Sequence, residues 1–124
     1  MTPRGLLFVV ISALCTVMAN LLMRGGLLRA GGLTLSLDLA AEQMRALGRQ
    51  PMFVVGVLLY GVAAIVWFRV ISTEELSTSY PLLVSLTFVL VTAGAVVFFH
   101  EPISWQKLLG IGVIFIGILL VANA

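Results

Sequence analysis

Long apolar runs alternate with short polar breaks along the chain. In the segment 80–121, two apolar runs flank the polar break His100-Glu101-Pro102. About twenty apolar residues in a helix are enough to cross the ~30 Å hydrocarbon core of a bilayer. The break cannot lie in lipid, because proline lacks an amide donor and charged side chains cost about 3 kcal/mol or more there. The segment therefore predicts a transmembrane helical hairpin with its turn at one membrane surface.

Two further apolar runs precede this hairpin. The pattern predicts a single domain over residues 1–124 with four spans, at about 6–23, 52–71, 80–99 and 104–121. A cleavable signal peptide is the alternative for the first run, because Arg4 precedes it and Val17-Met18-Ala19 resembles a cleavage site. The run is longer than the apolar region of most signal peptides, so a retained helix is the prediction. Ser104 is expected to cap the fourth span, and Pro81 to lie in the first turn of the third, which begins near Thr78 or Tyr80.

The segment 24–50 is the polar part of the chain. Gly25-Gly26 and Gly31-Gly32 predict breaks in any helix there. Charged residues then recur at spacings of four, three and four, which place them on one face of a short helix: Asp38, Glu42, Arg45 and Arg49. Ala40, Met44 and Leu47 fall on another face, and Ser36 or Asp38 is the expected cap. We expect this helix to lie in the headgroup region, with a partly ordered loop as the alternative.

Composition supports the same class. Of the 124 residues, 61% are hydrophobic and only 10% are charged, whereas a soluble domain carries about a quarter charged residues. The fold predicted is therefore an all-α integral membrane protein with four transmembrane helices, because the ten-residue alternation of a β-barrel does not occur. The lone Cys15 excludes an intrachain disulfide, and the net charge of +2 is too small to indicate a nucleic-acid partner.

Four spans place both termini on the same side of the membrane. The opposite side then carries most of the basic residues: Arg24, Arg29, Arg45, Arg49 and Lys107. The positive-inside rule favours a cytoplasmic location for that side, which includes the His100-Glu101 turn.

Polar side chains follow the first span at intervals of four residues: Ser12, Thr16, Asn20 and Arg24. Such a stripe is costly in lipid, so it should face other helices or a wet cavity. Contact between helices and lining of a cavity are equally plausible for Ser12 and Thr16. For Asn20 and Arg24 the cavity is favoured.

The second half of the chain offers fewer polar candidates. On the third span, Tyr80 and Thr87 share one face, and Ser85 and Thr92 share another. Glu101 is interpreted as part of a polar turn near Arg24 or Lys107, with a role in proton coupling as the alternative.

Gly110 and Gly117 are seven residues apart on the fourth span and predict close helix packing, within one protomer or between two.

With one histidine, no nucleophile–base pair and no phosphate loop, we expect no enzyme activity, no catalytic residue, no metal site and no cofactor.

Four short stretches carry a resemblance to a known family. They are ANLLMR at 19–24, SYPLL at 79–83, FFHEPIS at 98–104 and LLGIGVIFIGILL at 108–120. The chain resembles the small multidrug resistance group of the drug/metabolite transporter (EamA-like) superfamily. In that family, drug exporters exchange protons for cations at a membrane glutamate, and that position corresponds to Thr16 here. Their stacking tryptophan corresponds to Leu83, and their tyrosine is kept as Tyr80. The resemblance therefore argues against a proton-coupled drug pump.

Within that group the chain resembles most the aminoarabinose-phosphoundecaprenol flippase subunits, which also lack the glutamate. This resemblance implies movement of a polyprenyl-phosphate-linked sugar across the bacterial inner membrane. It also implies an anionic headgroup that is attracted to Arg24 and hydrogen-bonded by Asn20, Thr16 and Tyr80. The expected substrate-binding set is Thr16, Asn20, Arg24, Tyr80, Ser85, Thr87 and Glu101.

Transporters of this kind combine two inverted halves, so we expect a homodimer or a heterodimer with a sister four-helix subunit, packed through Gly110 and Gly117. Two alternatives remain open. One is a small multidrug or metabolite exporter that works without the glutamate. The other is an accessory membrane subunit of a glycosyltransferase system.

Overall fold

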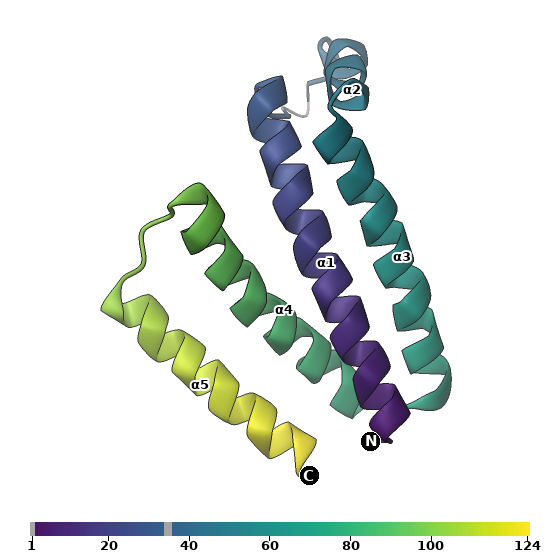
Figure 1. The fold of residues 1–124 in the computed structure, drawn as a ribbon, viewed down its shortest axis with the longest axis vertical. Coiled ribbons are helices and arrows are strands. Elements are labelled where there is room, and N and C mark those ends of the chain that lie inside the picture. Colours follow the sequence, from purple (N-terminus) through teal and green to yellow (C-terminus); the bar gives the residue numbers. More distant parts are fainter. Residues whose placement is uncertain (1, 34–35) are drawn as a thin grey trace.

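The computed structural model describes residues 2–33 and 36–124, and every regular element in those ranges is a helix (Figure 1). The elements are α1 (Pro3–Ala30), α2 (Ala40–Gly48), α3 (Pro51–Thr73), α4 (Leu76–Phe99) and α5 (Trp105–Ala122). By length and composition, α1, α3, α4 and α5 can each cross a membrane. The all-α class with four apolar helices and a short helix in the first loop is thus confirmed.

Helix α1 is longer than predicted. It begins after Thr2, whose hydroxyl accepts a hydrogen bond from the Gly5 amide at 3.1 Å, and it ends at Gly31, which is left-handed with φ of 90°. The predicted break at Gly25-Gly26 is wrong, because both residues lie inside the helix. Only the second glycine pair stops it.

The internal glycines instead allow α1 and α3 to approach each other closely. A Cβ atom on Gly26 would lie 2.7 Å from the Cβ of Phe53, and one on Gly56 would lie 2.7 Å from the Cγ of Met23. Real Cβ atoms do not come so close, so a larger residue at either position would push the two helices apart. The energy gained by this packing outweighs the low helix propensity of glycine.

Helix α2 differs from its prediction in detail. Leu39 occupies the N-cap position without a side-chain hydrogen bond, so the predicted cap by Ser36 or Asp38 is wrong. Asp38 lies before the helix and Arg49 follows it, which leaves two of the four predicted charged residues within it. Its apolar residues also differ in burial, because Leu47 is only 3% exposed whereas Met44 is 67% exposed.

Glu74 and Glu75 alone connect α3 to α4. Helix α4 therefore begins at Leu76, earlier than predicted, and Pro81 lies inside it rather than in the first turn. Proline there leaves one carbonyl of the preceding turn without its helical donor. The predicted cap of α5 is confirmed, since the Ser104 hydroxyl accepts from the Lys107 amide at 3.2 Å.

Helix α1 packs against both α3 and α4, whereas α5 runs beside α4 alone among the described helices. Both chain ends lie at one end of the bundle, and the α4–α5 turn and α2 lie toward the other (Figure 1). The buried core is small, centred on Val9, Val70 and Leu82. No residue of α5 is buried. Most apolar side chains therefore face outward, as expected where lipid or a second subunit covers them.

Candidate functional site

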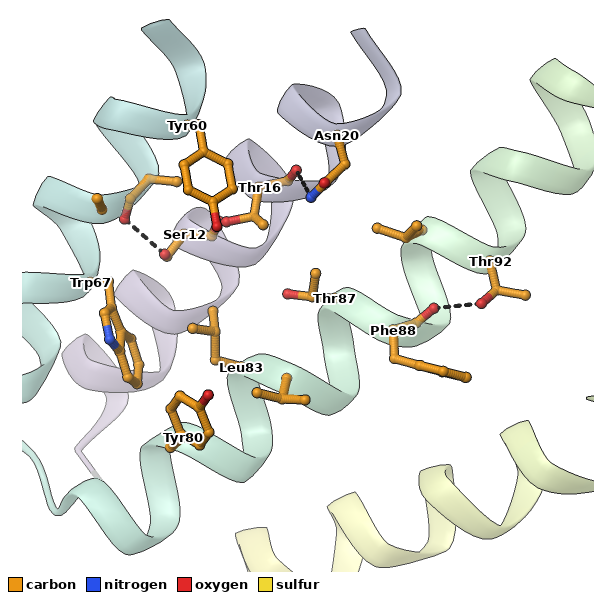
Figure 2. A pocket seen from close by; sticks show the side chains of 14 residues that line it. Ser12, Thr16, Asn20, Tyr60, Trp67, Tyr80, Leu83, Thr87, Phe88 and Thr92 are labelled. Atoms are coloured by element: carbon orange, nitrogen blue, oxygen red, sulfur yellow. Dashed lines mark hydrogen bonds between the residues drawn. The ribbon is translucent and has the colours of Figure 1, made fainter. Parts of the chain in front are cut away.

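An open cavity of about 600 Å³ lies between α1, α3 and α4 (Figure 2). None of its lining residues carries a charge. Its polar and aromatic side chains are Ser12, Thr16, Asn20, Tyr60, Trp67, Tyr80, Thr87, Phe88 and Thr92. The remaining lining positions are aliphatic, including Leu83. The cavity is therefore neutral, with hydroxyl groups, an amide and aromatic rings available to a ligand.

Helix α1 supplies one polar edge of this cavity. Thr16 donates its hydroxyl to the Ser12 carbonyl at 2.8 Å, and Asn20 donates its amide to the Thr16 carbonyl at 2.8 Å. Each bond remains within the helix and satisfies a donor that would otherwise face an apolar medium. The Asn20 amide keeps a second N–H and its carbonyl oxygen for another partner. Ser12 differs, since its hydroxyl donates to the Ala63 carbonyl of α3 at 3.0 Å and only 1% of the residue is exposed.

The aromatic edge comes from α3 and the start of α4. The rings of Trp67 and Tyr80 lie 6.0 Å apart between centroids and are tilted by 53° (Figure 2), a favourable geometry for an aromatic pair. Tyr60 lines the same cavity two helical turns before Trp67. Tyr60 and Trp67 were not among the predicted site residues. Their spacing of seven is the sequence signal that could have indicated a shared face.

The predicted residues of α4 separate into two groups. Tyr80 and Thr87 both line the cavity, and the Thr87 hydroxyl is buried without a hydrogen-bond partner. Ser85 does not line the cavity, so the structure does not bring it together with the other predicted residues. Thr92, predicted to share a face with Ser85, lines the cavity instead and donates its hydroxyl to the Phe88 carbonyl at 2.8 Å.

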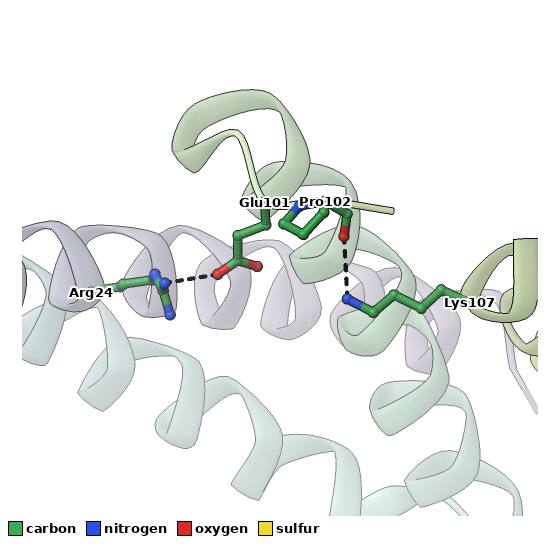
Figure 3. Close-up of polar contacts among 4 residues, drawn as sticks. All are labelled: Arg24, Glu101, Pro102 and Lys107. Carbon is green, nitrogen blue, oxygen red and sulfur yellow. Dashed lines mark hydrogen bonds and ion pairs between the residues drawn. The ribbon is translucent and has the colours of Figure 1, made fainter. Parts of the chain in front are cut away.

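Arg24 lies farther along α1, in an adjoining cavity of about 430 Å³ that also includes Asn20 and Glu101. Its guanidinium nitrogen is 2.8 Å from a Glu101 carboxylate oxygen (Figure 3). The guanidinium also lies 5.2 Å from the centre of the Phe99 ring, within the range of a cation–π contact. Lys107 donates to the Pro102 carbonyl at 3.2 Å (Figure 3). The interpretation of Glu101 as part of a polar turn near Arg24 is confirmed.

Gly110 and Gly117 lie on α5 without close neighbours. A Cβ atom added at either position would meet no atom of the described chain within 4 Å. The glycines thus make no close packing contact among the described residues, although Gly110 borders a cavity that it shares with residues of α4. Packing between protomers stays a prediction.

Comparison with known proteins decides the family. The model of the family described as Small Multidrug Resistance protein matches residues 34–114, which is more than half of the chain. The chain belongs to the Small Multidrug Resistance family. With its four apolar helices, this family member is a multi-pass membrane transporter rather than an enzyme. The family match begins beyond α1, so it does not cover Thr16, Asn20 and Arg24.

Individual relatives extend the comparison over α1. A probable 4-amino-4-deoxy-L-arabinose-phosphoundecaprenol flippase subunit ArnF of Klebsiella pneumoniae (strain 342) is 34% identical over 120 residues, which cover 93% of this chain and 92% of the relative. A probable flippase subunit ArnE of the same description from Aeromonas hydrophila is 38% identical over 75 residues, 60% of this chain and 65% of the relative. The corresponding ArnF of Enterobacter sp. (strain 638) is 44% identical over 70 residues, 55% of this chain and 54% of the relative. The match thus spans less than two thirds of the last two relatives. No solved structure matches this Small Multidrug Resistance protein.

Proposed function

We propose that the chain is half of a dimeric flippase that moves a polyprenyl (undecaprenyl) phosphate-linked sugar, or a related anionic lipid, across the bacterial inner membrane. The observation that carries this proposal is the position of Arg24, ion-paired with Glu101, in a cavity that adjoins an uncharged polar and aromatic one through Asn20. A lipid-linked sugar has the matching order of groups, with a neutral or polar sugar next to a phosphate.

The chemistry of each part fits one part of such a headgroup. Aromatic rings such as Trp67 and Tyr80 pack against the apolar faces of a sugar ring, and the Thr87 hydroxyl and the Asn20 amide offer hydrogen bonds to its hydroxyl groups. The Arg24 guanidinium suits a phosphate, because its planar N–H groups bind phosphate oxygens in pairs. The prenyl tail can remain in the bilayer, so the cavity needs to hold only the headgroup.

Export of lipophilic cations is the competing function, and the cavity opposes it. No carboxylate lines the cavity beside Thr16, where the family's drug exporters carry their glutamate. A cation entering there would lose hydration without gaining a counter-ion, which is strongly unfavourable at low dielectric.

The dimer is supported by the surface of α5. None of its residues is buried, and a Cβ atom at either of its two aligned glycines, Gly110 and Gly117, would meet no described atom within 4 Å. Relatives of the chain are described as flippase subunits, in two kinds named ArnE and ArnF. We propose either an antiparallel homodimer or a heterodimer with a sister subunit, in which the second half closes the cavity.

Binding of the purified protein to undecaprenyl phosphate and to its sugar conjugates tests the proposal, beside a panel of lipophilic cations. We expect saturable binding of the phosphate lipids, weakened about tenfold or more in Arg24→Ala, because a charge-assisted hydrogen bond contributes about 1.5–3 kcal/mol. Arg69→Ala is the matched control, since it removes an exposed arginine at the other end of the bundle. Binding of cations alone, unaffected by Arg24→Ala, would favour the exporter.

The accessory-subunit alternative makes a different prediction. An accessory subunit would stay functional in Asn20→Ala and lose function in Gly117→Leu, because it needs the interface and not the cavity.

A further inference from the structure

Arg24 already holds an anion. The Glu101 carboxylate lies 2.8 Å from its guanidinium, and the two side chains are 35% and 51% exposed, so the pair is accessible from outside the bundle. The two charges cancel, and the resting site therefore has little net attraction for a phosphate. An anionic headgroup that reaches Arg24 must compete with Glu101 for the same N–H groups.

The ion pair also connects α1 to the turn between α4 and α5. Glu101 belongs to the turn at residues 100–104, which follows α4 and leads into α5. The turn starts at His100, whose left-handed φ of 53° reverses the chain. Because α5 runs beside α4 alone among the described helices, the ion pair is a direct side-chain link between α1 and this turn.

A second cation lies on the turn side of Glu101. Lys107 lines a cavity of about 310 Å³ to which Glu101 also contributes. Its ammonium group donates to the Pro102 carbonyl at 3.2 Å, so this exposed side chain is held next to the turn. Glu101 thus has a cation on either side, one on α1 and one at the start of α5.

We infer that Glu101 and the anionic headgroup compete for Arg24. When the phosphate takes the guanidinium, Glu101 leaves it for Lys107, and the α4–α5 turn is released from α1. The inference rests on the proposed function, since it requires an anionic lipid at Arg24. It makes Glu101 a residue that sets the affinity for the headgroup and couples its arrival to movement of the turn.

Binding of undecaprenyl phosphate in detergent tests the competition. We expect Glu101→Gln to bind about three- to tenfold more tightly than wild type, because removal of an accessible ion-pair partner frees Arg24. The gain should vanish when Arg24→Ala is combined with it. Lys107→Gln should bind more weakly than wild type, because Glu101 then has no second cation. Glu75→Gln, at the opposite end of α4, removes the same charge and should leave binding unchanged.

The release of the turn has its own measurement. Spin labels at Leu28 and Ile103, both exposed, in a Cys15→Ser background report the distance between α1 and the turn. We expect undecaprenyl phosphate to lengthen or broaden this distance in wild type, and Glu101→Gln to do so without the lipid. An unchanged distance in both cases would overturn the release.

The outcomes separate this inference from the proposed function. If wild type binds the phosphate lipid through Arg24 but Glu101→Gln binds it equally or more weakly, the competition is overturned and the proposed function stands. If neither protein binds the phosphate lipid, both are overturned.

Discussion

The buried hydroxyl of Ser12 on α1 donates a hydrogen bond to the backbone carbonyl of Ala63 on α3, across 3.0 Å. This contact divides the polar stripe of α1 by role. Ser12 joins two helices, whereas Thr16 and Asn20, one and two turns farther along, bond only within their own helix and face the cavity. A single stripe in the sequence therefore serves packing at one end and the cavity at the other.

Replacing Ser12 by alanine should lower the stability of the protein by about 1 kcal/mol or slightly less, the range for hydrogen bonds between membrane helices. The expected result is a lower melting temperature in detergent. Ser72→Ala is the control, because the Ser72 hydroxyl is exposed and bonds only to the Arg69 carbonyl of its own helix. Equal melting temperatures for the two variants would show that the link between α1 and α3 does not contribute.

Gly56→Ala should be more harmful than Gly61→Ala, although both substitutions lie on α3. The new Cβ at position 56 would lie 2.9 Å from the Ala19 carbonyl oxygen, whereas at position 61 it would meet nothing within 4 Å. We expect a loss of about 1–3 kcal/mol for the first, from overpacking, and a neutral or slightly stabilising effect for the second. Thermal unfolding in detergent measures both, and equal behaviour would contradict the close approach of α1 and α3.

The helix class and the number of apolar helices followed from hydropathy, because the bilayer leaves few structures for an apolar chain. Helix ends were less predictable. Gly25-Gly26 was expected to break α1, but glycine is compatible with a membrane helix when a neighbouring helix needs the space, and only Phe53 and Met52 of α3 reveal that need. Likewise, the segment 72–79 is mostly polar, so the sequence predicted a later start for the third span than Leu76, where α4 begins.

The site was predictable where it follows one helix and less so where it crosses several. The spacing of four along α1 brought Thr16, Asn20 and Arg24 to one side, and the cavities contain all three. The contribution of α3 was missed, because Tyr60 and Trp67 line the cavity from a span that carries no polar stripe in the sequence. Ser85 was predicted to share a face of α4 with Thr92, but only Thr92 lines the cavity.

Gly117→Leu and Gly110→Leu should dissociate the dimer without unfolding the protomer. Both glycines share a face of α5, and a Cβ atom at either position would meet no atom of the described chain within 4 Å, so we expect the new side chains to be accommodated in the protomer and to obstruct a second subunit packed on that face. Gly112→Leu is the control, because residue 112 lies on the opposite face of the helix. Cross-linking in membranes should detect fewer dimers for the first two variants. An undiminished dimer in both would move the interface away from this face.

Glu74 lies at the end of the bundle that holds both termini, and it should make the stability of the protein depend on pH. The hydroxyl of Thr2 donates to its carboxylate and lowers the pKa of Glu74 below the ordinary value of 4.5. The ionised group therefore stabilises the folded state above about pH 4.5, and this contribution is lost as the pH falls through the folded-state pKa. Glu74→Gln should melt slightly below wild type at pH 7 and together with it near pH 3.

Glu75→Gln is the control for that measurement, because Glu75 accepts no side-chain hydrogen bond from Thr2 in the structure. A constant difference between Glu74→Gln and wild type at both pH values would contradict the hydrogen-bond explanation.

Transbilayer movement of an undecaprenyl-phosphate-linked sugar in proteoliposomes tests the central claim most directly, with the sister subunit added if the chain alone does not form dimers. Wild type and Arg69→Ala should move the lipid at the same rate, and Arg24→Ala should be slower by about tenfold or more, following the loss of one charge-assisted contact to phosphate. Movement that is equally fast in Arg24→Ala, or absent in wild type while a lipophilic cation is transported, would contradict the account.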